Sequence, residues 1–312
     1  MTRDLEPRLD GRERAEPARG SRGGGTDLPA DAADVTRDTL TAALDLPDRA
    51  RGERVHAHGR DYRLSGDDVR TLATVGAFRV VPAGELRPST DRAPTRPARA
   101  LERLRDDGLL ETRPYVVGRT RTTLVTLTDR GRSLLEAHRR PERDRPAQAF
   151  YAGVSKPREL AHDARVHQAY TTVVDRLTAR GARVRRVVLE VELKRDYQRF
   201  LQAGNRGRRD GDGRPTVDTE AIAEWARSRQ LPCEDGHVTL PDLRVEFEEP
   251  DGRFAIEDVE VMTPHYRGAH AAGKARAGFT RFRAVGARVG GGGGAARSGR
   301  HRGGGLADEV LA

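Results

Sequence analysis

Residues 101–135 read LERLRDDGLLETRPYVVGRTRTTLVTLTDRGRSLL, and they decide the fold of the first half of the chain. Leucines three residues apart predict the end of a helix, and Gly108 suits the position that terminates it. Two runs rich in β-branched residues, 110–117 and 120–127, predict strands, and the Gly-Arg pair between them matches a two-residue hairpin turn. A closing helix is predicted to begin at Thr128, a favourable capping residue.

Capping residues upstream of this stretch predict further helices. Ser65 followed by two aspartates opens the first, because serine caps a helix end and the acids lie in the positive first turn. A short helix is predicted at 83–86. Thr95 caps a third helix that runs to Asp107, with a proline tolerated in its first turn. The region 64–138 is therefore expected to contain three helices, a β-hairpin and a final helix, in that order.

Arginines gather on the third helix and on the hairpin. The segment 87–121 contains nine arginines and five acidic residues, a net charge of +4. Three of these arginines are spaced by three and four residues, so they share one helix face within about 60° of each other, away from the inward leucines. They are Arg96, Arg99 and Arg103, and two more, Arg119 and Arg121, lie at the hairpin turn. We expect this surface to meet a polyanion.

The order of elements and the phrases LxxLxxxGLL and LTxxGxxLL resemble the winged-helix family. The resemblance implies that the third helix enters the major groove of double-stranded DNA, while the hairpin touches the backbone or the minor groove. It implies base or phosphate contacts for Arg96, Arg99 and Arg103. For Arg119 and Arg121 it implies phosphate contacts near the wing. A winged helix that binds a protein partner and merely exposes these arginines is the alternative.

The composition of the whole chain agrees with a polyanionic partner and argues against disulfide-linked, cysteine-zinc and membrane-spanning proteins. The 312 residues carry a net charge of +9, with a pI of about 10.3. Arginine supplies 54 of the 57 basic residues, so the three lysines, Lys156, Lys194 and Lys274, are of interest as compact point charges. The single cysteine excludes an internal disulfide and a cysteine-based zinc site. With no run of about 18 apolar residues and no signal segment, we expect a cytoplasmic protein without a membrane partner.

Shifts in composition divide the chain into four segments. Residues 1–60 and 287–312 are rich in Arg and Gly and poor in apolar residues, so we expect disordered tails, with one short helix within 40–46. Between them, 61–140 and 147–286 carry periodic hydrophobic patterns and are expected to fold as two domains. The expected fold class is mixed, α+β or α/β.

The second domain combines helix and strand patterns. Helices are predicted at 160–180 and 219–229, and a strand at 184–194. The runs 243–247 and 254–262, separated by a Glu-Pro-Asp-Gly turn, predict a β-hairpin. A mixed sheet flanked by helices is therefore expected.

This hairpin is expected to bring two carboxylates to one end of the sheet. Centring it on the Pro-Asp pair of its turn places Asp242 opposite Val259, and a one-residue bulge would move the partner to Glu260 or Val261. In each register Asp242 and Glu260 finish close together. Two or three carboxylates near a cation suit a divalent metal site for phosphodiester chemistry, with Mg²⁺ or Mn²⁺ as the metal. A nearby lysine would stabilise the developing charge.

The same residues resemble the PD-(D/E)xK nuclease superfamily. Pro241-Asp242 matches its first step and Glu260 its second acid, whereas Met262 stands where the superfamily has its lysine. Lys274, predicted on the following helix, would supply the lysine from a migrated position. The resemblance implies catalytic roles for Asp242, Glu260 and Lys274. An intact site, a degenerate site on a nuclease-like fold and an unrelated α/β fold all stay open.

A third metal ligand would come from the strand predicted at 184–194. Glu190 or Glu192 is the candidate, and Glu190 completes the predicted metal set with Asp242 and Glu260. A competing register uses Glu192-Leu-Lys194 as the (D/E)xK step, but no Pro-Asp pair precedes it at a suitable distance.

The whole layout resembles the replication-relaxation family, including the helix motif LxHDxRVxxAY at 160–170, which contains His162 and Asp163. The resemblance spans about residues 64–285. It implies a DNA-binding protein that acts in the replication or mobilisation of plasmids and integrative elements, with metal-dependent DNA nicking as an open question. One alternative is a non-enzymatic transcriptional regulator whose degenerate nuclease-like domain dimerises. Another is a protein-interaction adaptor. Whether the chain forms a homodimer is not decided by the sequence.

Overall fold

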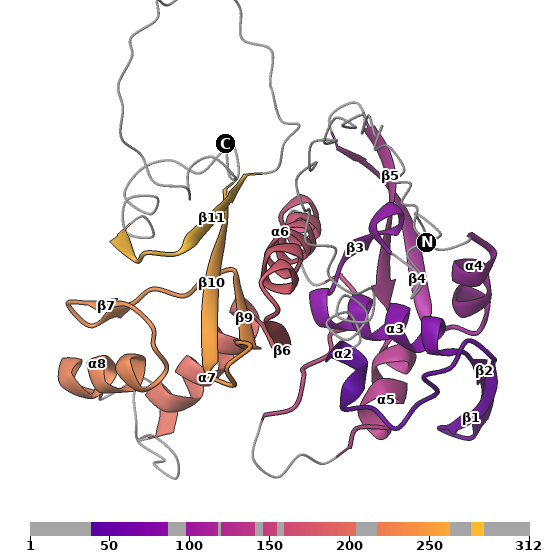
Figure 1. Ribbon diagram of the computed structural model, residues 1–312, viewed down its shortest axis with the longest axis horizontal. Coiled ribbons are helices and arrows are strands. Elements are labelled where there is room, and N and C mark those ends of the chain that lie inside the picture. The colour runs from indigo at the N-terminus through magenta and orange to yellow at the C-terminus, as the bar shows by residue number, and fades with distance from the viewer. Residues whose placement is uncertain are drawn as a thin grey trace, which may run out of the picture.

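The computed structural model describes residues 39–86, 98–117, 120–140, 146–154, 159–203, 217–262 and 276–283. These residues form a mixed α+β structure in which helices pack on two larger sheets, and two small hairpins complete the described part (Figure 1). In chain order the elements are α2 (Thr39–Ala42), β1 (Glu53–Ala57), β2 (Arg60–Leu64), α3 (Gly66–Phe78), β3 (Val81–Pro82), η1 (Ala83–Glu85), α4 (Ala98–Asp106), β4 (Leu110–Val117), β5 (Thr120–Leu127), α5 (Asp129–Ala137), α6 (Leu160–Ala179), β6 (Arg183–Leu189), α7 (Glu190–Gln202), α8 (Thr219–Ser228), β7 (Cys233–Glu234), β8 (His237–Val238), β9 (Leu243–Glu248), β10 (Phe254–Met262) and β11 (Thr280–Arg283).

The elements from α2 to α5 are called the first unit, and α3 and α5 begin where the capping residues predict. The hydroxyl oxygen of Ser65 accepts from the backbone N–H of Asp68 at 3.3 Å, and the Asp68 carboxylate accepts from the N–H of Ser65 at 2.8 Å. Thr128 caps α5 by accepting from the N–H of Gly131 at 3.0 Å. The helix predictions are confirmed here, with the short helix formed as η1. The predicted start of the third helix at Thr95 lies outside the described residues.

A three-stranded antiparallel sheet, in the order β3-β5-β4, completes the first unit. Strands β4 and β5 have the predicted bounds and pair from Leu110 opposite Leu127 to Val117 opposite Thr120. Gly108 follows α4 with a φ of +71°, a conformation that glycine adopts without strain, and so ends the helix as predicted. The predicted Gly-Arg turn between the strands lies outside the described residues.

The prediction of a disordered segment up to residue 60 is wrong for residues 39–60. Helix α2 confirms the short helix expected there, but β1 and β2 were missed. They pair as an antiparallel hairpin that turns at His58 and Gly59, both with positive φ, as a tight hairpin turn requires. Each strand buries alternate residues, and charged residues between them masked this pattern in the composition. Residues 1–38 and the predicted tail 287–312 lie outside the described part.

Residues 146–154, between the two units, pack on both. The N–H of Tyr151 donates to the carbonyl oxygen of Gly76 at 2.8 Å, and that of Gly153 to Leu127 at 2.8 Å. On the other side, the side-chain amide of Gln148 makes two hydrogen bonds, of 2.9 and 3.0 Å, with the backbone of Val187 in β6. This segment therefore satisfies part of the open edge of β6.

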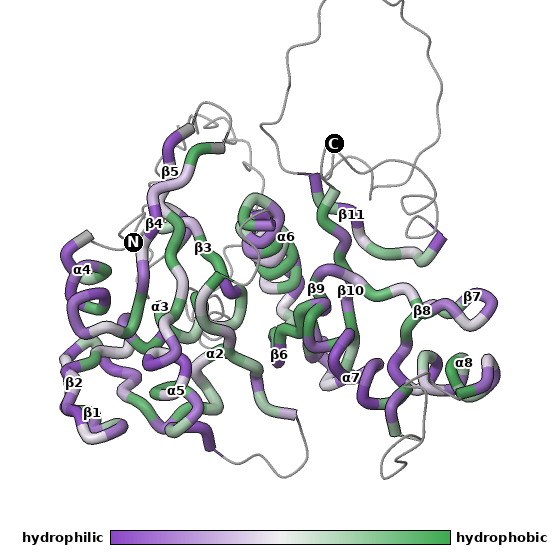
Figure 2. Tube along the Cα trace, turned by 180° about the vertical axis from the view of Figure 1, so that it is seen from behind, coloured by the Kyte–Doolittle hydropathy of each residue, from purple (hydrophilic) through white to green (hydrophobic). Residues whose placement is uncertain are grey.

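The elements from α6 to β11 are called the second unit, and they surround a mixed four-stranded sheet in the order β11-β10-β9-β6. Strands β6, β9 and β10 are antiparallel neighbours, and β11 runs parallel to β10. Helix α6 lies between this sheet and the first unit in both views (Figures 1 and 2). Its Tyr170 ring packs 4.6 Å from the Phe78 ring of α3, centroid to centroid. One hydrophobic core consequently spans both units.

The β9–β10 hairpin has the predicted strands, with a register shifted by one residue from the centred one. Val259 lies opposite Leu243, so paired residue numbers sum to 502 rather than 501. Continued by one step, this ladder sets Asp242 opposite Glu260, one of the two partners that a bulge would have allowed. The shift matters because it brings the two predicted acids level with each other at the end of the sheet.

The predicted strand at 184–194 is wrong in its second half, because β6 ends at Leu189 and α7 begins at Glu190. Acidic residues in the first turn favour a helix start, and Glu190 forms an ion pair of 2.8 Å with Lys194 one turn later. Leu193 is buried in a small cluster around Trp225 of α8.

A search of the described helices found no candidate membrane span.

Candidate functional site

Helix α4 buries leucine on one side and exposes arginine on the other. Leu101 and Leu104 are buried in the core. Arg99 is exposed, and its side chain has no hydrogen bond or ion pair in the described part of the chain. Arg96 lies outside the described residues. An exposed guanidinium without an internal partner is suited to bind a phosphate or the edge of a base.

Arg103 makes its contacts within the protein. Its guanidinium donates to Oδ2 of Asp68 and to the carbonyl oxygen of Arg63, each at 2.6 Å. The Asp68 carboxylate, whose residue is 1% exposed, also accepts from Ser65. Arg103 therefore ties α4 to the start of α3 and to β2. Of the predicted DNA-binding arginines that the structure describes, it is the one whose guanidinium holds the fold together.

The β4–β5 hairpin exposes mixed side chains toward its turn. Arg121 pairs in register with Val116, and both are exposed, Val116 by 58%. Arg113 forms an ion pair of 3.4 Å with Glu111 on the same strand. Arg121 has no such partner among the residues that the structure describes. The predicted contact Arg119 lies outside them.

Five arginines of the second unit are paired with acids of the sheet, of the β9–β10 turn and of α7. Arg244 binds both carboxylate oxygens of Asp258, directly opposite it in the ladder, at 2.7 and 2.8 Å. The other pairs join Arg176 to Glu257, Arg180 to Glu249, Arg185 to Glu248 and Arg186 to Glu192. These arginines neutralise carboxylates inside the unit. Glu257 and Asp258 of β10 therefore have a structural role, as the partners of Arg176 and Arg244.

Asp242 stands at the N-terminal end of β9, where the sheet meets α6 and α7. Its Oδ2 accepts a hydrogen bond of 2.8 Å from the backbone N–H of Val261, and the residue is 7% exposed. Its own carbonyl oxygen accepts from the N–H of Glu190 at 3.1 Å. Glu260, the neighbouring acid of β10, is 2% exposed. The structure thus brings the two predicted acids together in a buried setting.

His162 of α6 reaches the same place. Its Nε2 lies 3.6 Å from Oδ1 of Asp242, an ion-pair distance that exceeds a normal hydrogen bond. Burial lowers the pKa of His162, but the contact with Asp242 and the charges of Asp242, Asp163 and Glu260 outweigh it and raise the pKa above the usual value. His162 therefore carries more positive charge near neutral pH than an exposed histidine.

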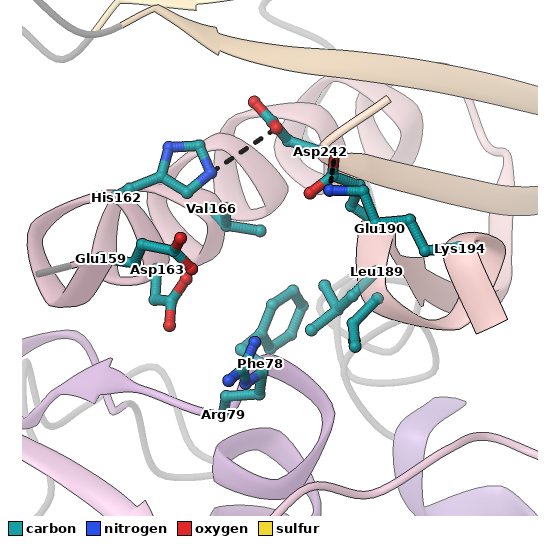
Figure 3. Close-up of a pocket in the computed structure, with 11 residues that line it drawn as sticks. Phe78, Arg79, Glu159, His162, Asp163, Val166, Leu189, Glu190, Lys194 and Asp242 are labelled. Carbon is teal, nitrogen blue, oxygen red and sulfur yellow. Dashed lines mark ion pairs between the residues drawn. The ribbon is translucent and has the colours of Figure 1, made fainter. Parts of the chain in front are cut away.

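Asp242 and His162 line a pocket of about 140 Å³ that both units share (Figure 3). Its wall consists of Phe78, Arg79, Glu159, His162, Asp163, Val166, Leu189, Glu190, Val191, Lys194 and Asp242. Helix α6 supplies one side, the start of α7 a second, and the end of α3 a third (Figure 3). The sequence motif pointed to His162 and Asp163. No local sequence pattern pointed to Arg79 or Glu159, whereas Lys194 was noted as one of three lysines and as part of the competing (D/E)xK register.

The described residues do not fit a preformed Mg²⁺ or Mn²⁺ site. No group of three or more His, Cys, Asp or Glu side chains arranged to hold a metal occurs among them. One carboxylate oxygen of Asp242 accepts from Val261 and the other faces His162, while Glu190 is bound to Lys194. Met262 stands at the position where the superfamily has its lysine, and its side chain carries no charge. Lys274, the predicted replacement, lies outside the described residues.

Comparisons with models of known protein families, with curated proteins and with solved structures found no match to this chain.

Proposed function

We propose that the protein binds double-stranded DNA through its first unit, with α4 in the major groove and the β4–β5 hairpin against the backbone. One observation carries the proposal: Arg99 on α4 and Arg121 on the β4–β5 hairpin are both exposed, and neither side chain has a hydrogen bond or ion pair among the residues that the structure describes. Guanidinium groups that are free of internal acids are the ones able to bind phosphates.

The order of elements in the first unit supports a winged-helix domain. Helix α3, the 3₁₀ turn η1, α4, the β4–β5 hairpin and α5 follow one another, and the short strand β3 joins the hairpin in one sheet. Arg103 supports the same function indirectly, since its bonds to Asp68 and Arg63 fix the orientation of α4. A recognition helix must be held rigidly to present its side chains to a groove.

The second unit supports the resemblance to the replication-relaxation family. Its mixed sheet sets Asp242 and Glu260 side by side, as a nuclease-like fold would require. A role in the replication or mobilisation of plasmids or integrative elements follows from that resemblance. Met262 stands where a nuclease of this kind has its lysine, so we propose the binding of DNA without its cleavage, the behaviour expected of a regulator built on a nuclease-like scaffold.

DNA binding is tested by anisotropy titration of the full chain with a labelled duplex over a range of salt concentrations. Each lost phosphate contact lowers the slope of log K against log salt by about 0.9. The double variant Arg99→Ala/Arg121→Ala should therefore bind more weakly, with a slope reduced by about 2. Arg253→Ala is the control, because Arg253 lies exposed in the distant β9–β10 turn. Equal affinity and slope for the double variant and the control would refute the proposed interface.

Cleavage is tested separately, by incubating supercoiled plasmid with the full chain and Mg²⁺ or Mn²⁺. The proposal expects retarded plasmid whose topology does not change. Nicking by the wild type that Asp242→Ala abolishes would instead establish a nuclease and overturn binding without cleavage.

A further inference from the structure

The backbone at Arg79 adopts a conformation that arginine rarely takes. Its φ is +65° and its ψ −51°, and the N–H of Val80 donates to the carbonyl oxygen of Phe78 at 2.7 Å. A hydrogen bond between residues i and i+2 around a positive φ defines the strained form of the γ-turn. Strain of this kind persists where the surrounding structure imposes it, and it gathers at binding sites.

This turn sets Arg79 on the wall of the pocket that the two units share (Figure 3). The other charged residues of the wall already have partners. Lys194 is bound to Glu190, and His162 faces Asp242. The two remaining acids of the wall, Glu159 and Asp163, also take part in interactions. Arg79 is the charged wall residue whose side chain makes neither a hydrogen bond nor an ion pair within the described part of the chain.

We propose that this pocket binds a phosphate group, which Arg79 recognises through its guanidinium and which lies between the two units. A planar guanidinium offers two parallel donors that match two oxygens of a phosphate. Lys194 of α7 and His162 of α6 lie on the facing walls, where they are paired with Glu190 and Asp242, so Arg79 is the wall cation available to the phosphate among the described residues. The volume of about 140 Å³ is enough for several water molecules, so the pocket admits a phosphate group.

Both units contribute residues to the wall of this pocket. Arg79 belongs to the end of α3, which leads into the sheet of the first unit, while Lys194, His162 and Asp242 belong to the second unit. A bound phosphate would therefore contact both. The phosphate belongs either to a free phosphate compound, such as a nucleotide, or to a nucleic-acid backbone, and the two sources share this chemistry.

The test is calorimetric titration of inorganic phosphate into the full chain at neutral pH, in the presence of a chelator and at constant ionic strength. The decisive variant is Arg79→Gly, because glycine accepts a positive φ and removes the guanidinium without disturbing the turn. We expect saturable binding to the wild type and at least tenfold weaker binding to Arg79→Gly. Arg227→Ala is the control, since Arg227 is exposed on α8 away from the pocket, and it should bind as the wild type does.

Thermal unfolding separates recognition from a structural role. Arg79→Gly should unfold at the same temperature as the wild type or higher, because the strain at φ +65° is relieved, while the upward shift caused by phosphate is lost. Displacement of phosphate by a nucleoside monophosphate would identify a free nucleotide as the ligand, and displacement by duplex DNA would identify a backbone phosphate. Equal phosphate affinity of wild type and Arg79→Gly, or binding that requires a divalent cation, would overturn the proposal. Neither result depends on Arg99 or Arg121, so the phosphate site and the proposed DNA interface are tested independently.

Discussion

The backbone N–H of Val261 donates a hydrogen bond of 2.8 Å to Oδ2 of Asp242, across the ends of β9 and β10. The bond forms because the hairpin register brings Asp242 level with Glu260, next to Val261. It closes the open end of the hairpin, and it fixes the orientation of the Asp242 carboxylate. The acid that resembles a catalytic residue therefore also supports the fold.

Replacing Asp242 should lower the free energy of unfolding. Asp242→Ala leaves the buried N–H of Val261 without its acceptor, which costs about 1–3 kcal/mol. Asp242→Asn keeps an oxygen in the same place and should cost less. Urea denaturation of the two variants beside the wild type measures both effects. If Asp242→Ala unfolds at the wild-type midpoint, the bond to Val261 contributes nothing and this account of the hairpin end is wrong.

The contact between His162 and Asp242 should make stability depend on pH. The pKa of His162 is raised in the folded protein, so folding favours the protonated imidazole. This contribution is fully present below about pH 6.5, the unfolded value, and is lost as the pH rises through the higher folded pKa. Titration of the His162 ring signal by NMR should give a midpoint above the ordinary histidine value of about 6.5.

A matched variant isolates this effect on stability. His162→Asn removes the titrating group, so the difference in unfolding free energy between wild type and variant should shrink as the pH rises. A difference that stays constant as the pH rises from about 6.5 would show that the charge of His162 does not contribute to the free energy of unfolding.

The link between Arg103 and Asp68 should be worth more than a surface ion pair. The Arg103 side chain is 44% exposed, but Asp68 is buried and accepts from both Arg103 and Ser65. Removing the guanidinium leaves a buried carboxylate short of a donor, so Arg103→Ala should cost about 1–3 kcal/mol. A double-mutant cycle with Asp68→Asn should give a coupling energy of about 0.5–3 kcal/mol. Additive effects of the two substitutions would contradict a direct link.

Gly131 should tolerate no side chain, although it lies in the first turn of a helix. A Cβ there would lie 2.2 Å from the carbonyl oxygen of Leu109, in the loop between α4 and β4. Gly131→Ala should therefore shift this backbone and destabilise the protein by about 1–3 kcal/mol. Gly84→Ala is the control, since a Cβ at Gly84 meets nothing within 4 Å. Thermal unfolding that affects both variants equally would refute the close approach.

Local patterns in the sequence were enough to predict α3, η1, α4, β4, β5 and α5 of the first unit and the β9–β10 hairpin of the second. Caps such as Ser65 and Thr128 act on backbone groups within three residues, and the strands of a hairpin are joined by a short turn. The β1–β2 hairpin was missed because its alternation spans only five residues per strand, among charged residues. The change from strand to helix at Glu190 was missed because VVLEVELK fits either period.

What the sequence by itself determined, then, is the run of elements from α3 to α5, the helices α6 and α8, and the β9–β10 hairpin with an acid at its end. Tertiary structure decided what faces that acid. Arg79, His162 and Asp242 come from three elements far apart in the chain, and packing of α6 between the two sheets brings them to one pocket. It also decided which arginines are bound internally and which stay exposed. The physical reason is range: caps, turns and periodicity act over a few residues, whereas pocket walls and ion pairs form only when the core has packed.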